Sequence, residues 1–413
     1  MDGARICSQG GTVVGGIAYF TANSYQERLS PDGKLDHVCK REDYPYVAAI
    51  DVETMELIAT YPFADTYDSS PLVIRNRDGR WLVLAHEYAH ARTVAMRQED
   101  AAIEWISEAN QPGGMFFGYA YYRKENGDTT VLASVKNGLH AMSLETGRDE
   151  WFFPLAGGVT PCVDQKGGTV YFQTKGMLLK IRAETGEIMK SVSVSQPSGC
   201  VCWNTVWADD AYGCHVVTYW YSPEPFGSAI RVFDEELNLV WESKRLPMSK
   251  KATLAYHGGL IYAGCGDHWQ KEPYLQLQDG RWKTIRAYRI QDGRIEWELD
   301  LRGYGFSCIP NIIYCNGRII AESQTNLSHL GHHLFTADAG TGSLLSHEYK
   351  ETPANSCGVP LLTAGKLFSG DLVSDSVLIT EIDTGHCTDW IGAFGNAQTN
   401  DMCAPDGALL ALR

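Results

Sequence analysis

The sequence predicts an all-β fold, a β-propeller of eight four-stranded blades. Three observations support this prediction. One strand–turn–strand unit recurs eight times along the 413 residues, at intervals of roughly 40 to 55 residues that are typical of propeller blades. A second strand pair precedes each copy. A ninth copy of that first pair closes the chain. Seven blades are the alternative count.

The recurring unit is an alternating strand, a tight turn and a second strand that often ends in Trp. Its turns contain Thr-Gly or Asp-Gly, which supply the positive φ that tight hairpins need, and the flanks alternate with period two. The copies span 48–61, 95–107, 141–153, 180–192, 231–243, 287–299, 336–348 and 379–391.

The preceding strand pairs also contain hairpin turns. Clear examples span 160–174, 253–265, 308–323 and 357–370. The final segment MCAPDGALLALR repeats this half-unit, so we expect the C-terminal strands to close the ring and remove exposed sheet edges. The chain is therefore a single domain, 1–413. Its expected units are 11–63, 70–109, 115–155, 158–195, 199–247, 252–303, 306–350 and 356–394, with closing strands over 395–413.

The turn of this unit follows a pattern, A-x-D-x-x-T-G-x-x-x-W. Ser143–Trp151, Arg182–Lys190 and Glu381–Trp390 match it most fully. The pattern resembles the PQQ-like β-propeller repeat family, and the resemblance implies the fold over the whole chain. It implies little about function, because this fold hosts dehydrogenases, scaffold proteins and unrelated enzymes. The quinone-dependent dehydrogenases typically use an adjacent Cys-Cys pair, which is missing here, so PQQ is not expected as a cofactor.

Composition restricts the partners and the compartment. The net charge is −15 and no basic run exceeds Lys250-Lys251, which argues against nucleic acid. No apolar run approaches membrane-spanning length, so no membrane partner is expected. The N-terminus MDGARICSQGG lacks the apolar core of a signal peptide, which favours a cytoplasmic protein. A secreted or periplasmic protein without its signal peptide is the alternative. The 12 cysteines form no C-x-x-C pair and are expected to be free thiols.

The stretch His86–His90 reads HEYAH and matches the zinc-protease signature H-E-x-x-H. In those enzymes the motif lies on a helix, whereas here strand-like segments flank it. Thr93 and Met96 stand where the extended signature requires Gly and a third His. The sequence therefore does not predict a metalloprotease.

The connections between the two halves of a unit should all lie on one face of the disc. The longest span 23–45, 86–92, 219–228, 265–283 and 323–334. Long connections on one rim of a rigid scaffold are where ligand sites are usually found. Seven of the 12 histidines lie there, namely His37, His86, His90, His268, His329, His332 and His333. The alternative for any one of them is an ordinary solvated surface residue.

Histidines, aromatic side chains and arginines on one face suit a carbohydrate-active enzyme. The function predicted from them is a lyase that acts on an acidic, uronate-containing oligosaccharide, a small-molecule or oligosaccharide partner. A base would remove the proton α to the carboxylate and an acid would protonate the leaving oxygen. The predicted acid–base residues are His90, His268, His332 and Tyr221. Trp220, Trp269 and Trp282 would stack on sugar rings, and Arg28, Arg41 and Arg92 would bind the carboxylate.

Other functions remain open at this point. Two or three of His86, His90, His332 and His333 could converge on a divalent metal ion, since neutral imidazole suits Zn²⁺ and Mn²⁺. A sulfotransferase or a hydrolase would fit the face almost as well. The alternative of a different class is a non-catalytic PQQ-like scaffold or binding protein, similar to the propeller lipoprotein of outer-membrane protein assembly.

Overall fold

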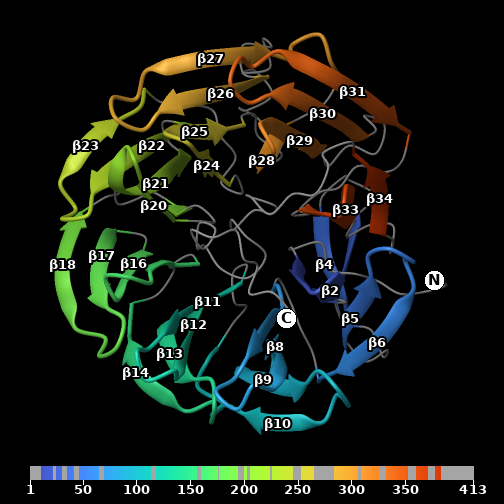
Figure 1. Cartoon of the computed structure of the whole chain (residues 1–413), viewed down its shortest axis with the longest axis vertical. Helices are drawn as coiled ribbons and strands as arrows, with labels where there is room; N and C mark the ends of the chain where they lie inside the picture. The colour runs from blue at the N-terminus through green and yellow to red at the C-terminus, as the bar shows by residue number, and fades with distance from the viewer. Residues whose placement is uncertain are drawn as a thin grey trace.

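The structure, a computed structural model, is a disc of eight antiparallel sheets around a central axis (Figure 1). It describes residues 11–21, 25–29, 35–40, 46–64, 69–112, 118–155, 160–174, 176–193, 200–201, 205–223, 226–244, 253–264, 283–305, 308–324, 332–351, 360–370 and 377–382. Every regular element among these residues is a strand. The predicted all-β, eight-bladed propeller is therefore confirmed, and the seven-bladed alternative is wrong.

Within a blade the chain runs outward from the axis, so the first strand is innermost (Figure 1). The innermost strands, from blade 1 to blade 8, are β1 (Gly11–Val14), β7 (Leu72–Arg75), β11 (Tyr119–Arg123), β15 (Cys162–Asp164), β19 (Cys200–Val201) with β20 (Val206–Asp210), β24 (Ala255–His257), β28 (Cys308–Cys315) and β32 (Leu361–Thr363). The second strands are β2 (Ile17–Thr21), β8 (Trp81–Glu87), β12 (Thr129–Val135), β16 (Thr169–Gln173), β21 (Gly213–Pro223), β25 (Leu260–Ala263), β29 (Arg318–Gln324) and β33 (Lys366–Gly370).

The outer half of each blade holds the recurring unit found in the sequence. The third strands are β5 (Tyr46–Asp51), β9 (Arg92–Arg97), β13 (Gly138–Ser143), β17 (Met177–Arg182), β22 (Phe226–Asp234), β26 (Thr284–Arg289), β30 (His332–Asp338) and β34 (Val377–Glu381). The outermost are β6 (Leu57–Pro62), β10 (Ile103–Ile106), β14 (Asp149–Phe153), β18 (Ile188–Ser193), β23 (Leu239–Glu242), β27 (Ile295–Asp300) and β31 (Leu344–Lys350). The expected fourth strand of blade 8 and the closing strands over 395–413 lie outside the described residues.

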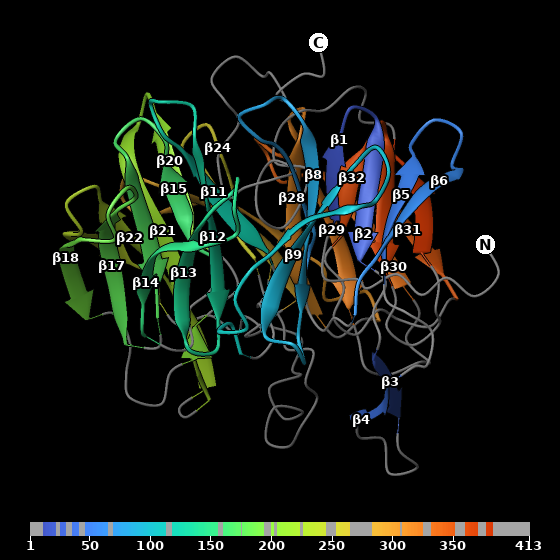
Figure 2. The same cartoon turned by 90° about the horizontal axis from the view of Figure 1, so that it is seen from below.

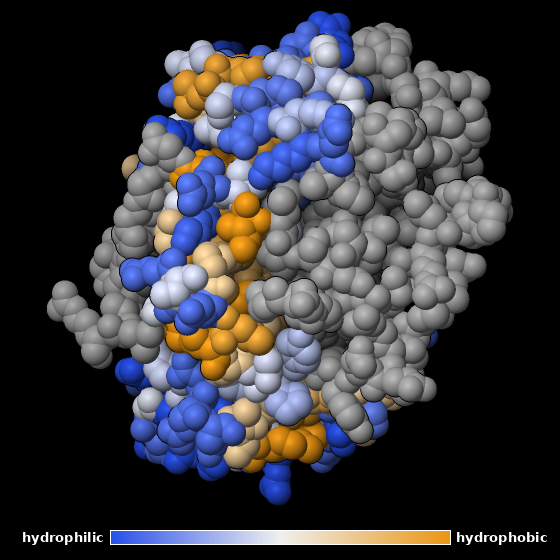
Figure 3. Space-filling model, turned by 90° about the vertical axis from the view of Figure 1, so that its right-hand side faces the viewer, coloured by the Kyte–Doolittle hydropathy of each residue, from blue (hydrophilic) through white to orange (hydrophobic). Residues whose placement is uncertain are grey.

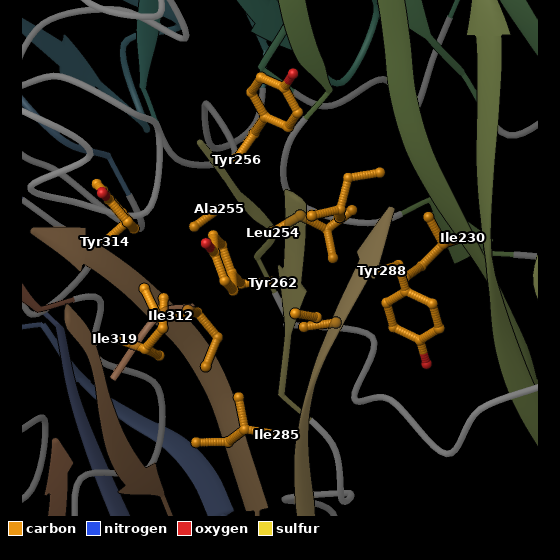
Figure 4. Close-up of a cluster of buried hydrophobic side chains, with 14 of the residues drawn as sticks. Ile230, Leu254, Ala255, Tyr256, Tyr262, Ile285, Tyr288, Ile312, Tyr314 and Ile319 are labelled. Carbon is orange, nitrogen blue, oxygen red and sulfur yellow. The ribbon is translucent and has the colours of Figure 1, made fainter. Parts of the chain in front are cut away.

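Burial follows the position of a strand in its blade. All seven residues of β12 are buried, because neighbouring blades cover both faces of the sheet, whereas β6 has one buried residue. Such two-sided burial explains why the second strands are nearly continuous apolar runs. Figure 4 shows the core where blades 5, 6 and 7 meet, in which the rings of Tyr262 and Tyr314 stack with centroids 5.8 Å apart.

The outer hairpin turn explains why Asp and Thr recur in the repeat. In blade 7 the Asp338 carboxylate accepts hydrogen bonds from the backbone amide of Thr341 at 2.8 Å and from its hydroxyl at 2.8 Å. In blade 1 Asp51 and Thr54 make the same two bonds, at 2.8 and 3.1 Å. An Asx-type turn of this kind satisfies amides that the strand ladder leaves unpaired.

The repeat tryptophan closes four of the described seams between blades. Each indole reaches from the outermost strand of one blade to the outer turn of the next, and its Nε1 donates to a backbone carbonyl at 2.6 to 2.9 Å. The pairs are Trp105–Leu144, Trp151–Ala183, Trp241–Ile290 and Trp297–Ala339. The turn glycine lies directly under the ring, and a Cβ there would come within 2.3 to 2.7 Å of an indole atom at Gly147, Gly186, Gly293 and Gly342. The glycine is therefore required by the close approach of the indole.

The rim of the disc consists of outermost strands and mixes polar and apolar residues (Figure 3). The residue that follows the turn is apolar and exposed in several blades, for instance Leu57 at 40%, Ile103 at 56% and Ile295 at 50%. Among the described residues, no helix is long and apolar enough to cross a membrane.

The two faces of the disc differ in the connections that reach them. We call the face reached by the connections between second and third strands the long-connection face, and the opposite one the turn face. The β3–β4 hairpin (Tyr25–Leu29 and Leu35–Lys40) lies within such a connection of blade 1 and stands out from the disc on the long-connection face (Figure 2).

Candidate functional site

The predicted site residues with described side chains come from three blades. His86, His90 and Arg92 belong to blade 2, Trp220 to blade 5, and His332 and His333 to blade 7. Arg28 lies in β3 and Tyr221 in β21, where the backbone alone is described. The other predicted residues, Arg41, His268, Trp269 and Trp282, lie outside the described residues, as does His329.

Several of these residues lie in strands and not in the expected connections. Strand β8 runs to Glu87, β21 runs to Pro223 before β22 begins at Phe226, and β30 begins at His332. Within the expected connection 219–228, residues 219–223 and 226–228 are therefore strand, whereas 86–92 keeps a turn over 88–91 between β8 and β9. Within 323–334, residues 323–324 and 332–334 are strand, and 325–331 lie outside the described residues. Burial follows from this pairing, with exposed fractions of 0% for His86, 3% for Trp220, 3% for His332 and 6% for His333.

Glu87, the acid of the HEYAH stretch, is a buried anchor. Its side chain is 3% exposed and accepts a hydrogen bond from Arg92 Nε at 2.5 Å. A second bond comes from the backbone amide of Ala64, in the segment that leaves blade 1, at 2.7 Å. His90 is 49% exposed, and its Nδ1 lies 3.9 Å from the carboxylate. Both oxygens of Glu87 are thus engaged, which compensates the burial of its charge and leaves the group poorly placed to activate water.

A buried polar network lies beside this anchor in blades 2 and 3. The Thr93 hydroxyl donates to Gln111 Oε1 at 2.8 Å, and the Tyr119 hydroxyl donates to Thr93 at 3.2 Å. Burial raises the pKa of Tyr119, so the phenol remains a neutral donor. These groups satisfy one another inside the protein, as buried polar groups usually do.

Blade 7 contains the second buried acid on the long-connection side. Glu322 is 1% exposed and its Oε2 lies 3.3 Å from Nε2 of His332, which is also buried. The Ser369 hydroxyl of blade 8 donates to the same carboxylate. His332 therefore contacts a carboxylate at the seam between blades 7 and 8 and does not face solvent.

The neighbouring His333 points to the other side of β30, as successive residues of a strand do. Its Nδ1 lies 2.9 Å from Nε2 of His347 on β31. The ring of Tyr304, from the connection between blades 6 and 7, is 4.4 Å from that of His347. His347 lies in the repeat copy 336–348, and its partner could not be predicted, since only the fold brings the two strands together.

The predicted stacking residue Trp220 lies inside blade 5. The guanidinium carbon of Arg231 sits 5.2 Å from its ring centroid, and the Arg231 Nε is paired with Glu242 at 2.5 Å. This cation–π contact occupies the indole within the blade.

The four histidines proposed as metal ligands come from two different blades. His86 and His90 lie in blade 2, and His332 and His333 point to opposite sides of blade 7. Within the described ranges, no group of three or more His, Cys, Asp or Glu side chains is arranged to hold a metal ion.

Three cysteines have described side chains, and they differ in state. Cys162 and Cys214 are free, as expected for them. Burial raises the pKa of the Cys214 thiol to about 11, and its contact with Asp209 adds to the effect. Cys315 is disulfide-bonded. The expectation of free thiols is therefore wrong for Cys315.

Comparison with known proteins identifies structural relatives only. No family model matches the chain, and neither does any curated protein. BamB from Moraxella catarrhalis superimposes with a TM-score of 0.52 at 12% identity, covering 89% of this chain and 99% of that one. A quinohemoprotein alcohol dehydrogenase from Comamonas testosteroni gives 0.54 at 13% identity, over 94% and 72% of the two chains. A europium-containing methanol dehydrogenase gives 0.55 at 10% identity, over 87% and 81%.

These likenesses overturn the prediction of a uronate lyase. The similar structures are a BamB and PQQ-type dehydrogenases, and carbohydrate binding and histidine acid–base chemistry gain no support from them. The PQQ-like propeller of the alternative agrees with these relatives in fold. At such low identity the likeness establishes the fold alone. The chain has the fold of a PQQ-like β-propeller.

Proposed function

We propose that the chain is a non-catalytic PQQ-like propeller that binds a partner through its long-connection face. One observation carries the proposal, namely that Glu87, His332 and His333 near this face are engaged within the protein. Glu87 is bonded to Arg92, His332 contacts Glu322, and His333 pairs with His347. Groups held in this way stabilise blades and connections and are not free for proton transfer to a ligand.

The shape of this face also supports a binding role. The β3–β4 hairpin projects from it as a separate two-stranded sheet (Figure 2). An isolated hairpin is marginally stable in water, and its strand edges can accept a strand from another chain. Blade 5 contributes the long pair β21 and β22, of 11 and 9 residues. The small-molecule or oligosaccharide ligand expected from the sequence remains a proposal for the same face.

Site-specific cross-linking would test the binding face. A photoreactive amino acid is placed at Asp36 in β4 or, as the matched control, at Asn126 in a turn on the opposite face. Irradiation in an extract of the native cells should give one dominant cross-linked protein from position 36 and none from position 126. Equal cross-linking from both positions would reject the long-connection face as the binding surface.

An activity assay tests the other half of the proposal. The purified chain is incubated with uronate-containing oligosaccharides, and the absorbance of a new C=C bond is followed near the ultraviolet edge. No unsaturated product should form at any concentration of the protein. Product formation that scales with protein would reject a non-catalytic function.

The compartment is part of the proposal. The sequence favoured the cytoplasm, with a secreted or periplasmic location as the alternative. We favour the secreted or periplasmic location, because Cys315 is disulfide-bonded. Disulfides persist in oxidising compartments and are rare in the cytosol.

A further inference from the structure

Two imidazole rings meet in the outer half of blade 7, beside blade 6. His333 Nδ1 and His347 Nε2 are 2.9 Å apart, and the rings lie 19° from parallel with centroids 5.1 Å apart. His333 is 6% exposed and His347 is half-buried. The pair links the third strand of blade 7 to its outermost strand.

This contact depends on protonation. A hydrogen bond between two imidazoles needs an N–H on one ring and a lone pair on the other, so at least one ring has to be neutral. When both rings are protonated, two N–H groups and two positive charges face each other at the same distance. Such a state is strongly unfavourable away from bulk water.

The described ring neighbours of the pair are uncharged aromatic side chains. Aromatic rings enclose the pair, with Tyr304 and Phe335 centroids 4.4 and 4.9 Å from His347, and Tyr349 4.9 Å from His333. Burial lowers the pKa of His347, although the exposed carboxylate of Glu348 partly opposes this effect.

Among the described residues, charged groups on the packed elements have other partners. From blade 6, Lys283 donates to the carbonyl of Tyr304 at 3.1 Å, and Arg302 pairs with Asp300. On β30, His332 contacts Glu322 on the far side of the blade. The other ion on β31 is Lys350, which donates to Thr380 of blade 8 at 2.8 Å.

The pair also lies at a structural junction. The His333 amide donates to the Ser323 hydroxyl of β29 at 2.9 Å, and Tyr304 packs edge-on against Phe335 with centroids 5.1 Å apart. The same few side chains therefore hold β29, β30, β31 and the connection from blade 6. A change at the histidine pair affects all of these contacts.

We propose that the His333–His347 pair is a proton-sensitive clasp, which holds the third strand of blade 7 to its outermost strand at neutral pH and loosens in acid. The direction of the pH effect follows from the number of protons that each state binds. The closed clasp binds fewer protons than the opened strands, where each histidine titrates near its ordinary pKa of about 6.5. The clasp is therefore complete above about pH 6.5 and weakens as the pH falls below it. The inference does not rest on the proposed partner binding.

Hydrogen exchange of the full chain at pH 7.5 and 5.5, corrected for intrinsic exchange rates, tests the clasp. In the wild type the protection of the β30 and β31 amides should fall about tenfold at the lower pH, the equivalent of one pKa unit of linkage. In His347→Gln the fall should disappear, because an amide can donate or accept at either pH. The matched control is His140→Gln in blade 3, where the ring contacts Asp149 at 2.9 Å, and here the fall in blade 7 should remain.

Two results would overturn the clasp. One is wild-type protection of β30 and β31 that is equal at both pH values, and the other is a fall that persists in His347→Gln. A second measurement covers the case in which the variant does not fold. In NMR spectra of the wild type, the two rings should titrate as a coupled pair in two separated steps. A single step near pH 6.5 for both rings would also reject the proposal.

Discussion

Two neighbouring seams are filled by different pairs of side chains. One lies between blades 2 and 3, and the other between blades 1 and 2. In the first, Trp105 covers Gly147, whose φ is 69°. In the second, Ala59 stands at the tryptophan position, and Ala101 stands at the glycine position with a φ of 59°. Both alanines pack against one core cluster. The backbone of the turn is therefore nearly the same, and the side chains at the seam are exchanged as a matched pair.

The seam between blades 4 and 5 supports the same interpretation. Lys190 occupies the tryptophan position, and its Nζ donates to Asn238 at 3.2 Å. Leu237 takes the turn position with a φ of 56° and is 2% exposed, within a core cluster that also contains Trp207 and Phe233. Where the outermost strand carries tryptophan, the turn of the next blade thus carries glycine. Where the strand carries alanine or lysine instead, the turn carries alanine or leucine. The comparison separates two reasons for the turn glycine, namely its positive φ and the room it leaves for an indole.

The largest loss of stability is expected when a tryptophan is removed from its seam. Trp297 is 7% exposed and donates to Ala339 of blade 7 at 2.8 Å. Trp297→Ala should lower the free energy of unfolding by about 3 to 5 kcal/mol, because it leaves a cavity and an unpaired carbonyl. Urea unfolding followed by circular dichroism measures the change.

The control for this variant lies on the same strand. Ile295 is 50% exposed, and Ile295→Ala should change the free energy by less than about 0.5 kcal/mol. Equal losses for the two variants would mean that the indole does not stabilise the seam more than any other residue of β27.

A smaller effect is expected when the glycine is replaced. A Cβ on Gly147 would lie 2.3 Å from Trp105 Cε3. Gly147→Ala should therefore cost about 2 to 4 kcal/mol, the sum of overpacking and left-handed backbone strain. In a Trp105→Ala background, which copies the seam between blades 1 and 2, the same substitution should cost about 1 to 2 kcal/mol, the strain alone.

The difference between the two costs is the coupling energy of a double-mutant cycle. It is obtained from urea unfolding of the wild type, both single variants and the double variant. If Gly147→Ala lowered the free energy of unfolding equally in both backgrounds, the glycine would be required only for its positive φ. The matched-pair interpretation would then fail.

The fold was predictable because each repeat encodes its own blade. The turn signals at Gly186 and Gly342 were recognised from Thr-Gly, and both adopt positive φ, at 74° and 72°. Thr-Gly or Asp-Gly is present in five of the eight copies, and alternating strands flank the turn in all eight, which establishes the ring. The exceptions at Ala101 and Leu237 could not be derived from the repeat, since their reason lies in the preceding blade.

The candidate site was less predictable because its contacts join distant residues. Glu87 is held by Ala64, 23 residues away, and Glu322 by Ser369, 47 residues away and in the next blade. Polar residues near the end of a strand look like loop residues until such partners are known. The aromatic stretch around Trp220 was assigned to a connection for this reason, although it continues β21.

The smallest change in stability is expected at the Asp-based outer turn, which occurs in both kinds of seam. Asp51 and Asp338 make the same turn, although Met55 follows in one and Gly342 in the other. The hydrogen bonds from Thr341 hold the pKa of Asp338 below its ordinary value of 3.8. The folded state therefore binds fewer protons, so this carboxylate stabilises the protein above about pH 4 and the contribution is lost as the pH falls further. Asp338→Asn should lower the melting temperature slightly at pH 7 and not at all near pH 2. Asp78→Asn, the same charge change on an exposed turn, is the control. If the two variants lost the same amount at pH 7, the turn bonds would contribute nothing beyond the charge, and the turn could not be the element that both seams share.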